Sequence, residues 1–345
     1  MLTLSQKVKL QTKERPTFIL KILLAHTPSL RKNYYGDQAI SGLKAFGSVA
    51  FHESEIALSP NELIEAAKGV DIIVADRLTT VPKIVFDSLP HLKVVLRCAV
   101  DVRNIDIAAA SHQGVLVTHA KPGFVESVSE LVLGLMVDLS RSVSLYAHAY
   151  HRGEVVQAGM GQQLSGCKVG IIGFGAIARH TANILNVMGM DILVYDPYVG
   201  KVPSFVQQTS LEELLGESDY VICLAVATEE TENLMNAARF RLMKKSAFFI
   251  NPSRGNLVDE GALFEVLKNR QIAGAALDVG RETDQMPNTK IAALPNVVAT
   301  PHIGGLTPPA ILAQALDTVD QVGELSRGMI PHGSLNAEHW TRRNR

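Results

Sequence analysis

The sequence is poor in the features that mark secreted, membrane-spanning and metal-binding proteins. Cysteine occurs three times in 345 residues, at Cys98, Cys167 and Cys223, far apart and in no metal-ligand spacing. We interpret all three as reduced thiols of a folded core and predict no metal site. No apolar run approaches the ~18 residues of a membrane-spanning helix, and the N-terminal arm is polar, with Lys7, Lys9, Lys13 and Glu14. The sequence therefore predicts a cytoplasmic protein that does not enter a membrane.

An excess of charge of either sign is also absent. Lysine and arginine number 33 and aspartate and glutamate 34, which gives a formal net charge of -1. With this balance the chain has no excess of basic residues that would attract nucleic acid or an anionic membrane, so a small-molecule partner is expected. Hydrophobic residues make up 47% and charged residues 19%, which predicts a packed core, and the length suits about two domains.

The sequence does contain short apolar runs that alternate with segments of helical spacing, the pattern of a parallel sheet wrapped by helices. The fold class is therefore predicted as α/β. A first series of strands is expected at 18–25, 70–75, 92–97 and 115–118. A second series is expected to begin at Lys168 and to continue at 192–196, 220–224, 247–250, 272–277 and 297–299.

A long helix is predicted between the two series, from Ser127 to Tyr150. Ser127 and Glu130 have the spacing of a capping box at its start. Its apolar residues cover more than one face and include Leu133 and Val137, which favours burial against a second partner. Homodimerisation is the preferred interpretation, and burial within one subunit is the alternative. A final helix is expected at 308–326, followed by a solvated basic tail at 341–345.

A glycine turn marks the expected nucleotide site. The strand from Lys168 runs into a helix through Gly173, Phe174, Gly175, Ala176 and Ile177. The first glycine allows a tight turn, the second allows the backbone to approach a pyrophosphate, and the helix start offers free amides. Ala178 occupies the third glycine position, where close packing is needed, and a methyl group is accommodated there.

An acidic residue completes this pattern. Asp196 ends the next predicted strand, 21 residues after Gly175. A carboxylate there can accept hydrogen bonds from the ribose hydroxyls and would repel a 2′-phosphate. Strand, glycine turn, helix and aspartate together predict NAD rather than NADP as the cofactor.

The residues from about Val70 to Thr307 resemble the D-isomer-specific 2-hydroxyacid dehydrogenase family. The matching segments are 92–95, 104–106, 127–130, the glycine turn at Gly173, 195–197, 251–255, 276–279 and 300–305. The resemblance implies a flavodoxin-like substrate domain and a doubly wound Rossmann nucleotide-binding domain. We predict an N-terminal arm at 1–17, the substrate domain at 18–119 plus 306–345, and the NAD-binding domain at 120–305.

The family places an arginine, a glutamate and a histidine around the reacting carbonyl. The resemblance assigns Arg254 to hold the carboxylate and stabilise the developing charge, and His302 to exchange the proton. In the family a glutamate orients the histidine. Counted without gaps from Asp278, that position holds Thr283, and only a one-residue deletion would bring Glu282 into it. Glu282 is therefore the candidate, and a solvated loop carboxylate is the alternative.

Further cofactor contacts follow from the same resemblance. Asp278 is expected to bind the nicotinamide carboxamide and to fix which face of the ring is presented. Val226 replaces a proline that often follows the preceding strand, whereas Thr228 and Thr231 match the family pattern. The remaining predicted cofactor-binding residues are Ala225, Thr231, Pro252, Ser253 and Gly304.

The predicted substrate loop departs from the family. Members hold the substrate carboxylate on backbone amides of a glycine-containing loop, whereas this chain has Val100 and Asp101 there. A carboxylate ~4 Å from the substrate carboxylate would cost about 4 kcal/mol at an effective dielectric near 20. Three solutions stay open. Asp101 can turn away, Arg103 or Arg77 can neutralise it, or the substrate can carry an amine or a hydroxyl group.

Two functions are compatible with these residues. The first is an NAD-dependent oxidoreductase that transfers a hydride between NAD(H) and a small D-2-hydroxy acid or its 2-oxo acid, with Arg254, His302 and Glu282 as catalytic residues. The alternative is an NAD-binding regulatory or scaffold protein of the same fold, which the changes at Asp101 and Thr283 motivate.

Overall fold

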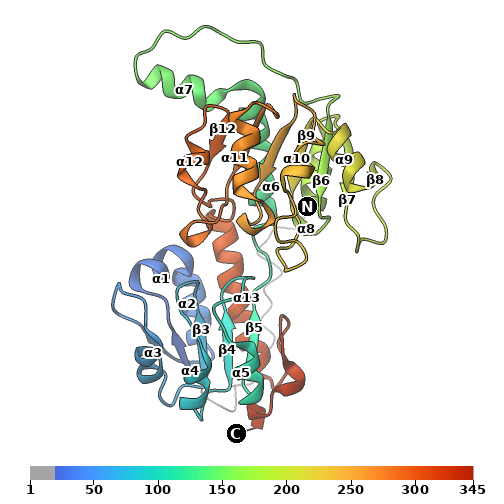
Figure 1. The fold of residues 1–345 in the computed structure, drawn as a ribbon. Coiled ribbons are helices and arrows are strands. Elements are labelled where there is room, and N and C mark those ends of the chain that lie inside the picture. The colour runs from blue at the N-terminus through green and yellow to red at the C-terminus, as the bar shows by residue number, and fades with distance from the viewer. Residues whose placement is uncertain (1–19, 345) are drawn as a thin grey trace, which may run out of the picture. The chain divides into compact units, whose positions relative to one another are not determined.

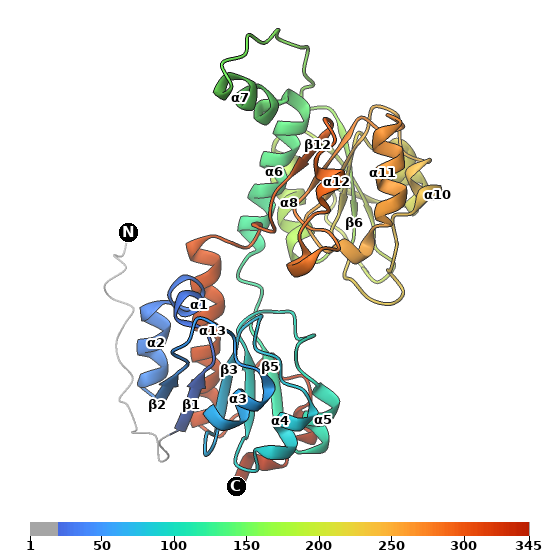
Figure 2. The same ribbon diagram turned by 60° about the vertical axis from the view of Figure 1, so that its left-hand side comes forward.

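The computed structural model describes residues 20–344, so the predicted N-terminal arm lies outside the described residues. The chain forms two compact units (Figures 1 and 2). The first, unit 1, comprises the residues up to Gly123 together with those from Ile311 onward, and unit 2 comprises Phe124–Ala310. The sequence predicted these divisions at 119/120 and 305/306.

Unit 1 is a five-stranded parallel sheet with helices on both faces. Its strands are β1 (Leu20–Leu24), β2 (Gly47–Phe51), β3 (Ile72–Ala75), β4 (Val94–Arg97) and β5 (Leu116–His119). Its helices are α1 (Pro28–Tyr34), α2 (Gly36–Lys44), α3 (Pro60–Ala66), α4 (Lys83–Ser88), α5 (Ile107–His112) and, from its fourth residue on, α13 (Pro308–Ser326). The strand order β2-β1-β3-β4-β5 is the flavodoxin-like order.

The side chains of these strands alternate between two cores. Leu23, Ile73 and Val95 face the core that contains Leu63 of α3 and Phe86 of α4. The strand residues beside them face the opposite core, which contains residues of α2 and α13. Strands buried on both faces explain the uninterrupted apolar runs in the sequence.

Unit 2 is a seven-stranded parallel sheet. Its strands are β6 (Lys168–Ile172), β7 (Asp191–Tyr195), β8 (Val206–Gln208), β9 (Tyr220–Cys223), β10 (Phe248–Asn251), β11 (Gly274–Leu277) and β12 (Val297–Ala299). Its helices are α6 (Val125–Arg141), α7 (Val143–His151), α8 (Ala176–Val187), α9 (Leu211–Glu217), α10 (Ala237–Phe240), α11 (Glu260–Lys268) and α12 (Thr289–Ala292). The order β12-β11-β10-β9-β6-β7-β8 is the doubly wound order extended by one strand.

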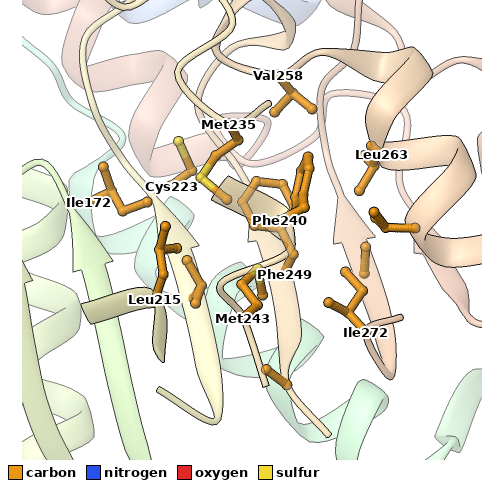
Figure 3. Close-up of a cluster of buried hydrophobic side chains, with 14 of the residues drawn as sticks. Ile172, Leu215, Cys223, Met235, Phe240, Met243, Phe249, Val258, Leu263 and Ile272 are labelled. Atoms are coloured by element: carbon orange, nitrogen blue, oxygen red, sulfur yellow. The ribbon is translucent and has the colours of Figure 1, made fainter. Parts of the chain in front are cut away.

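Two cores again cover the two faces of this sheet. Helices α6 and α8 bury Val132 and Ala182 against one face, with Ile171 of β6. Helices α9, α10 and α11 cover the other face, where Phe240 packs edge-on against Phe249 of β10. Figure 3 shows this second core with its aromatic centre. The predicted α/β fold with a doubly wound nucleotide-binding domain is thus confirmed.

The helix predicted from Ser127 to Tyr150 is wrong in two respects. It is two helices, because Ser142 adopts a left-handed conformation (φ 54°) between α6 and α7. The capping box is also absent, since α6 begins at Val125 and Ser127 Oγ instead bonds to Thr307 Oγ1 (2.7 Å). Strands β2 and β8 were not predicted at all, because most of their residues are not buried and they form no continuous apolar run.

The basic tail is also not merely solvated. Arg342 is buried, and its Nη1 donates to the main-chain carbonyls of Leu89 (2.6 Å) and Leu92 (3.1 Å). Trp340 Nε1 donates to the carbonyl of Lys93 (3.1 Å). These residues therefore fasten the segment after α13 onto the region around β4.

None of the helices between residues 20 and 344 combines the length and apolar character needed to cross a bilayer. Over the same residues, no group of three or more histidine, cysteine, aspartate or glutamate side chains could hold a metal ion.

Candidate active site

The glycine turn lies between β6 and α8, beside β9. Gly173 has a φ of +87°, and a Cβ on it would lie 2.7 Å from the Cα and N atoms of Ala225. Only glycine fits this conformation and this approach to the neighbouring chain. Gly175 is different, because it is exposed and a Cβ on it would meet no atom within 4 Å. The chain thus leaves open space at the start of α8, where Ala176 and half-buried Ile177 follow.

Asp196 fastens this turn to β7. Its Oδ2 accepts from the main-chain N–H of Phe174 (2.7 Å) and its Oδ1 from that of Tyr198 (2.9 Å). A carboxylate has about four acceptor positions, so two remain for ribose hydroxyls. The Phe174 side chain is buried, and the guanidinium of Arg179 lies 4.5 Å from its ring centroid. Sequence reasoning did not identify Arg179.

The loops after β9 and β10 are tied together by side chains. Ser253 Oγ donates to the carbonyl of Ala225 (2.9 Å), and Pro252 is buried beside it in the chain. Thr231 Oγ1 donates to the carbonyl of Val226 (2.7 Å) and accepts from the main-chain N–H of Thr228 (2.8 Å). The predicted cofactor residues of this region therefore hold the loops near the point where the strand order of the sheet reverses, between β6 and β9.

Arg254 lies in the turn after β10, which is stabilised by hydrogen bonds between neighbouring residues of the turn. Asn251 Nδ2 donates to the Arg254 carbonyl (2.9 Å), and Arg254 Nη1 donates to the Ser253 carbonyl (2.7 Å). A Cβ on Gly255 would lie 2.1 Å from the carbonyl carbon of Gly280. The turn that carries Arg254 therefore packs directly on the backbone of the loop after β11.

Asp278 directly follows β11 and is 1% exposed. Its Oδ1 accepts from Thr300 Oγ1 (2.6 Å) and from the main-chain N–H of Ile303 (2.9 Å), and its Oδ2 accepts from that of Gly304 (2.8 Å). Charge-assisted hydrogen bonds of this kind are strong in a buried setting. Asp278 thereby fixes the segment 300–304, which carries His302.

His302 is half-buried and adopts a left-handed conformation (φ 54°). Its Nδ1 lies 3.0 Å from the main-chain carbonyl of Asp284. A carbonyl only accepts, so Nδ1 carries the hydrogen and the lone pair of a neutral ring is on Nε2. Glu282 is exposed, and its Oε1 accepts from Asn288 Nδ2 (2.8 Å). The described hydrogen-bond partner of His302 is thus the main-chain carbonyl of Asp284, in the loop after β11 that also carries Glu282.

Arg281 was missed by sequence reasoning although it organises this part of unit 2. Its Nη2 donates to Glu232 Oε1 (2.7 Å), to Asn233 Oδ1 (2.7 Å) and to the Asn256 carbonyl (3.0 Å), and its Nε donates to the Val258 carbonyl (3.1 Å). It therefore joins three loops, those after β9, β10 and β11. The only sequence signal was the departure of residues 280–287 from the family pattern.

In unit 1 the predicted substrate loop follows β4. Asp101 is paired with Arg103, whose Nε lies 3.0 and 2.9 Å from the two carboxylate oxygens. This hydrogen bonding raises the pKa of Arg103. The pairing corresponds to one of the three solutions proposed from the sequence, neutralisation of Asp101 by Arg103. Val100 is half-buried next to it.

The carboxyl ends of β6, β9, β10, β11 and β12 lie at one edge of one parallel sheet, so these groups share that edge. The geometry of the glycine turn, with its open space at a helix start and its aspartate on the next strand, defines a dinucleotide-binding protein.

Comparison with known proteins narrows the class. The profile of the D-isomer specific 2-hydroxyacid dehydrogenase NAD binding domain matches residues 133–304. A glyoxylate reductase of Thermococcus kodakarensis is 31% identical over 315 residues, which are 88% of this chain and 94% of that protein. The chain belongs to the D-isomer-specific 2-hydroxyacid dehydrogenase family, and its cofactor is NAD.

Two further comparisons support the same family assignment. A D-3-phosphoglycerate dehydrogenase of Methanocaldococcus jannaschii is 33% identical over 305 residues, 87% of this chain and 57% of that protein. The chain spans about half the length of this and similar phosphoglycerate dehydrogenases. The NAD-complexed family member from Lactobacillus delbrueckii ssp. bulgaricus has a TM-score of 0.76 at 25% identity, over 91% of this chain and 99% of that one.

Proposed function

We propose that the protein transfers a hydride between NAD(H) and a small D-2-hydroxy acid or 2-oxo acid. The observation that carries the proposal is the loop after β11, which contacts both predicted catalytic segments. Asp284 accepts from His302, and Gln285 Oε1 accepts from the main-chain N–H of Gly255, next to Arg254. One loop thus ties the guanidinium segment to the imidazole segment at the edge of a nucleotide-binding sheet. The relatives named above are a reductase and dehydrogenases, which favours this function over the regulatory alternative.

The residues present fit the cofactor. The open space at Gly175 admits a pyrophosphate against the first amides of α8, and Asp196 retains acceptor positions for the ribose. Thr231, Ser253 and Asp278 border the nicotinamide end in this proposal. When bound, NAD supplies the nicotinamide carbon that accepts or gives the hydride.

Residues of the chain stabilise the negative charge that develops on the carbonyl oxygen and transfer the hydroxyl proton. Arg254 holds the substrate carboxylate and stabilises negative charge on the carbonyl oxygen as it develops. His302 takes the hydroxyl proton on Nε2 in the oxidative direction and returns it in the reductive direction. The Asp284 carbonyl keeps Nδ1 protonated, so that Nε2 is the nitrogen available to the substrate. Glu282 contacts Asn288 and in this proposal supports the loop.

The test is a turnover assay. Purified protein with NADH and a panel of small 2-oxo acids should oxidise NADH, and the D-hydroxy acid should be the product. NADH binding without turnover on any acid of the panel would contradict the proposal and favour a regulatory role.

We further propose a cytoplasmic homodimer that uses the surface around α7. Leu145 and Tyr150 of α7 and Val155 and Met160 of the following loop are exposed apolar residues. Figure 2 shows α7 and this loop standing away from the seven-stranded sheet. Exposed apolar groups on a protruding segment favour burial by a partner. Light scattering should give twice the chain mass, and Leu145→Glu should shift it toward the monomer.

A further inference from the structure

One side-chain hydrogen bond spans the nucleotide edge of unit 2. The hydroxyl group of Tyr198, in the loop after β7, donates to Glu230 Oε2 (2.9 Å), in the loop after β9. Strand β6 lies between β7 and β9 in the sheet (Figure 1). Neighbouring strands are about 4.8 Å apart, so β7 and β9 are separated by roughly 10 Å. The two side chains therefore reach toward each other across the carboxyl end of β6, where the glycine turn begins.

Both ends of this bridge are anchored by other hydrogen bonds. On the β7 side, the main-chain N–H of Tyr198 donates to Asp196 Oδ1 (2.9 Å), and Oδ2 of the same carboxylate accepts from a main-chain N–H of the glycine turn (2.7 Å). On the β9 side, Glu230 lies within a turn in which Thr231 Oγ1 accepts from the main-chain N–H of Thr228 (2.8 Å). The loops that present the two side chains are thus held in place.

The hydrogen bond itself is exposed to solvent. Tyr198 is 84% exposed, and Glu230 is exposed as well. The hydrogen bond, followed by the charge of the carboxylate, raises the pKa of Tyr198, so the phenol is protonated at neutral pH and acts as the donor. Among residues 20–344, no second hydrogen bond is described between these two loops. Because water competes for exposed donors and acceptors, this bond can open and close without a change in either loop.

The two loops border the expected position of the adenosine half of NAD. In a doubly wound sheet the dinucleotide binds at the carboxyl edge where the strand order reverses, here between β6 and β9. Asp196, the proposed acceptor for the adenosine ribose, is hydrogen-bonded to the backbone of Tyr198. Val226, in the loop after β9, is 76% exposed. An aromatic ring on one loop and an apolar side chain on the other suit a flat base such as adenine.

We propose that Tyr198 and Glu230 form a clasp that closes over the adenosine end of NAD and controls how fast the cofactor enters and leaves. The clasp opens when its one hydrogen bond breaks, and it closes again on the free or the loaded protein. Both residues are positioning residues, and neither takes part in hydride or proton transfer. The proposal depends on the cofactor site of unit 2 alone and is independent of the substrate.

The test measures cofactor exchange by stopped-flow fluorescence. Full-length protein is mixed with NADH to obtain the association rate constant, and bound NADH is displaced with excess NAD to obtain the dissociation rate constant. Tyr198→Phe removes only the hydroxyl group and leaves the charge unchanged. It should raise both rate constants about two- to tenfold, the range for loss of one hydrogen bond, and change the dissociation constant by less than about twofold. The melting temperature should stay the same, because the side chain is exposed.

A double-mutant cycle shows whether the two residues act through one bond. Tyr198→Phe, Glu230→Ala and the double variant should exchange NADH at nearly the same rate, since either single change already opens the clasp. Glu230→Gln keeps an acceptor oxygen and should lie closer to wild type. Glu229→Ala removes an exposed carboxylate from the neighbouring position and should exchange NADH like wild type.

Four results would overturn the clasp. Unchanged rate constants in Tyr198→Phe would show that the hydrogen bond does not limit exchange. Faster dissociation with an unchanged association rate constant would mean that the ring contacts the cofactor without obstructing its entry. Additive effects in the cycle would mean that the two residues act separately, and an equal effect of Glu229→Ala would assign the change to the charge of the loop. Absence of turnover on every 2-oxo acid would contradict the proposed function and leave these rate constants measurable, so the two proposals are tested separately.

Discussion

His302 Nδ1 and the main-chain carbonyl of Asp284 are 3.0 Å apart, and both residues adopt left-handed conformations, with φ values of 54° and 60°. Gln285 beside Asp284 is left-handed as well (φ 60°). Each such conformation costs about 1 kcal/mol or more for a residue with a Cβ. The hydrogen bonds of Asp278 to the 300–304 segment help to offset this cost. Three unfavourable conformations are therefore concentrated where the proton is proposed to be exchanged.

Replacement of His302 should separate chemistry from cofactor binding. His302→Ala should lower kcat by about 10²- to 10⁴-fold, the range for loss of a general acid–base group. The NADH dissociation constant, measured by fluorescence titration, should stay within a factor of about two, since no cofactor role is assigned to this side chain. A parallel loss of cofactor affinity would contradict the assignment.

The two glycines of the turn should respond differently to alanine. Gly173→Ala forces a left-handed alanine against the backbone of Ala225 and should lower the melting temperature. Gly175→Ala meets no atom of the chain, so it should melt like wild type but bind NADH more weakly. Thermal melting and NADH titration of both variants check this. Unchanged NADH affinity in Gly175→Ala would show that the open space is not the pyrophosphate position.

Arg281 should act as a positioning residue for Arg254. Arg281→Met removes the hydrogen bonds that hold the loops after β9, β10 and β11 together. We expect KM for the 2-oxo acid to rise and kcat to fall, each about tenfold, because a small misplacement of the guanidinium is costly. Arg239→Met, which removes a partly buried bond to the Leu234 carbonyl, is the matched control. A general loss of stability without a kinetic change would assign Arg281 to folding alone.

His332 should make the stability of unit 1 depend on pH. Burial opposes its protonation, but hydrogen bonds to Glu324 and Asp317 outweigh this and raise the pKa of His332 above its usual 6.5. A raised pKa in the folded state means that the stabilisation is complete below about pH 6.5 and is lost as the pH rises through the folded-state pKa.

The measurement compares the melting temperatures of wild type and His332→Gln. The wild type should exceed the variant by more at about pH 6 than at about pH 8. A difference that is independent of pH would mean that His332 contributes through packing and neutral hydrogen bonds only.

The sequence predicted what depends on local patterns. Apolar runs, the turn at Gly173 and the acidic residue Asp196 directly after β7 were sufficient to identify the nucleotide-binding sheet. They are short-range features whose physical reason lies within a few residues.

Features that depend on distant partners were not predictable. Ser127 has the spacing of a helix cap, but Thr307 competes for its hydroxyl from 180 residues away. Arg342 was predicted to be a solvated surface residue, because its hydrogen-bond partners, the carbonyls of Leu89 and Leu92, are distant in the sequence. Arg281 similarly acquires its importance only when three loops converge on its guanidinium.

The discontinuity of unit 1 has a consequence for synthesis on the ribosome. Unit 2 is one continuous stretch of the chain. The sheet of unit 1, in contrast, is covered on one face by Ala315 and Val322 of α13 and is hydrogen-bonded near β4 by Arg342, and these residues are synthesised last. At about 5–20 residues per second, roughly ten seconds or more pass between emergence of the early strands and arrival of these residues. We therefore expect unit 2 to complete its fold before unit 1 when the chain is synthesised.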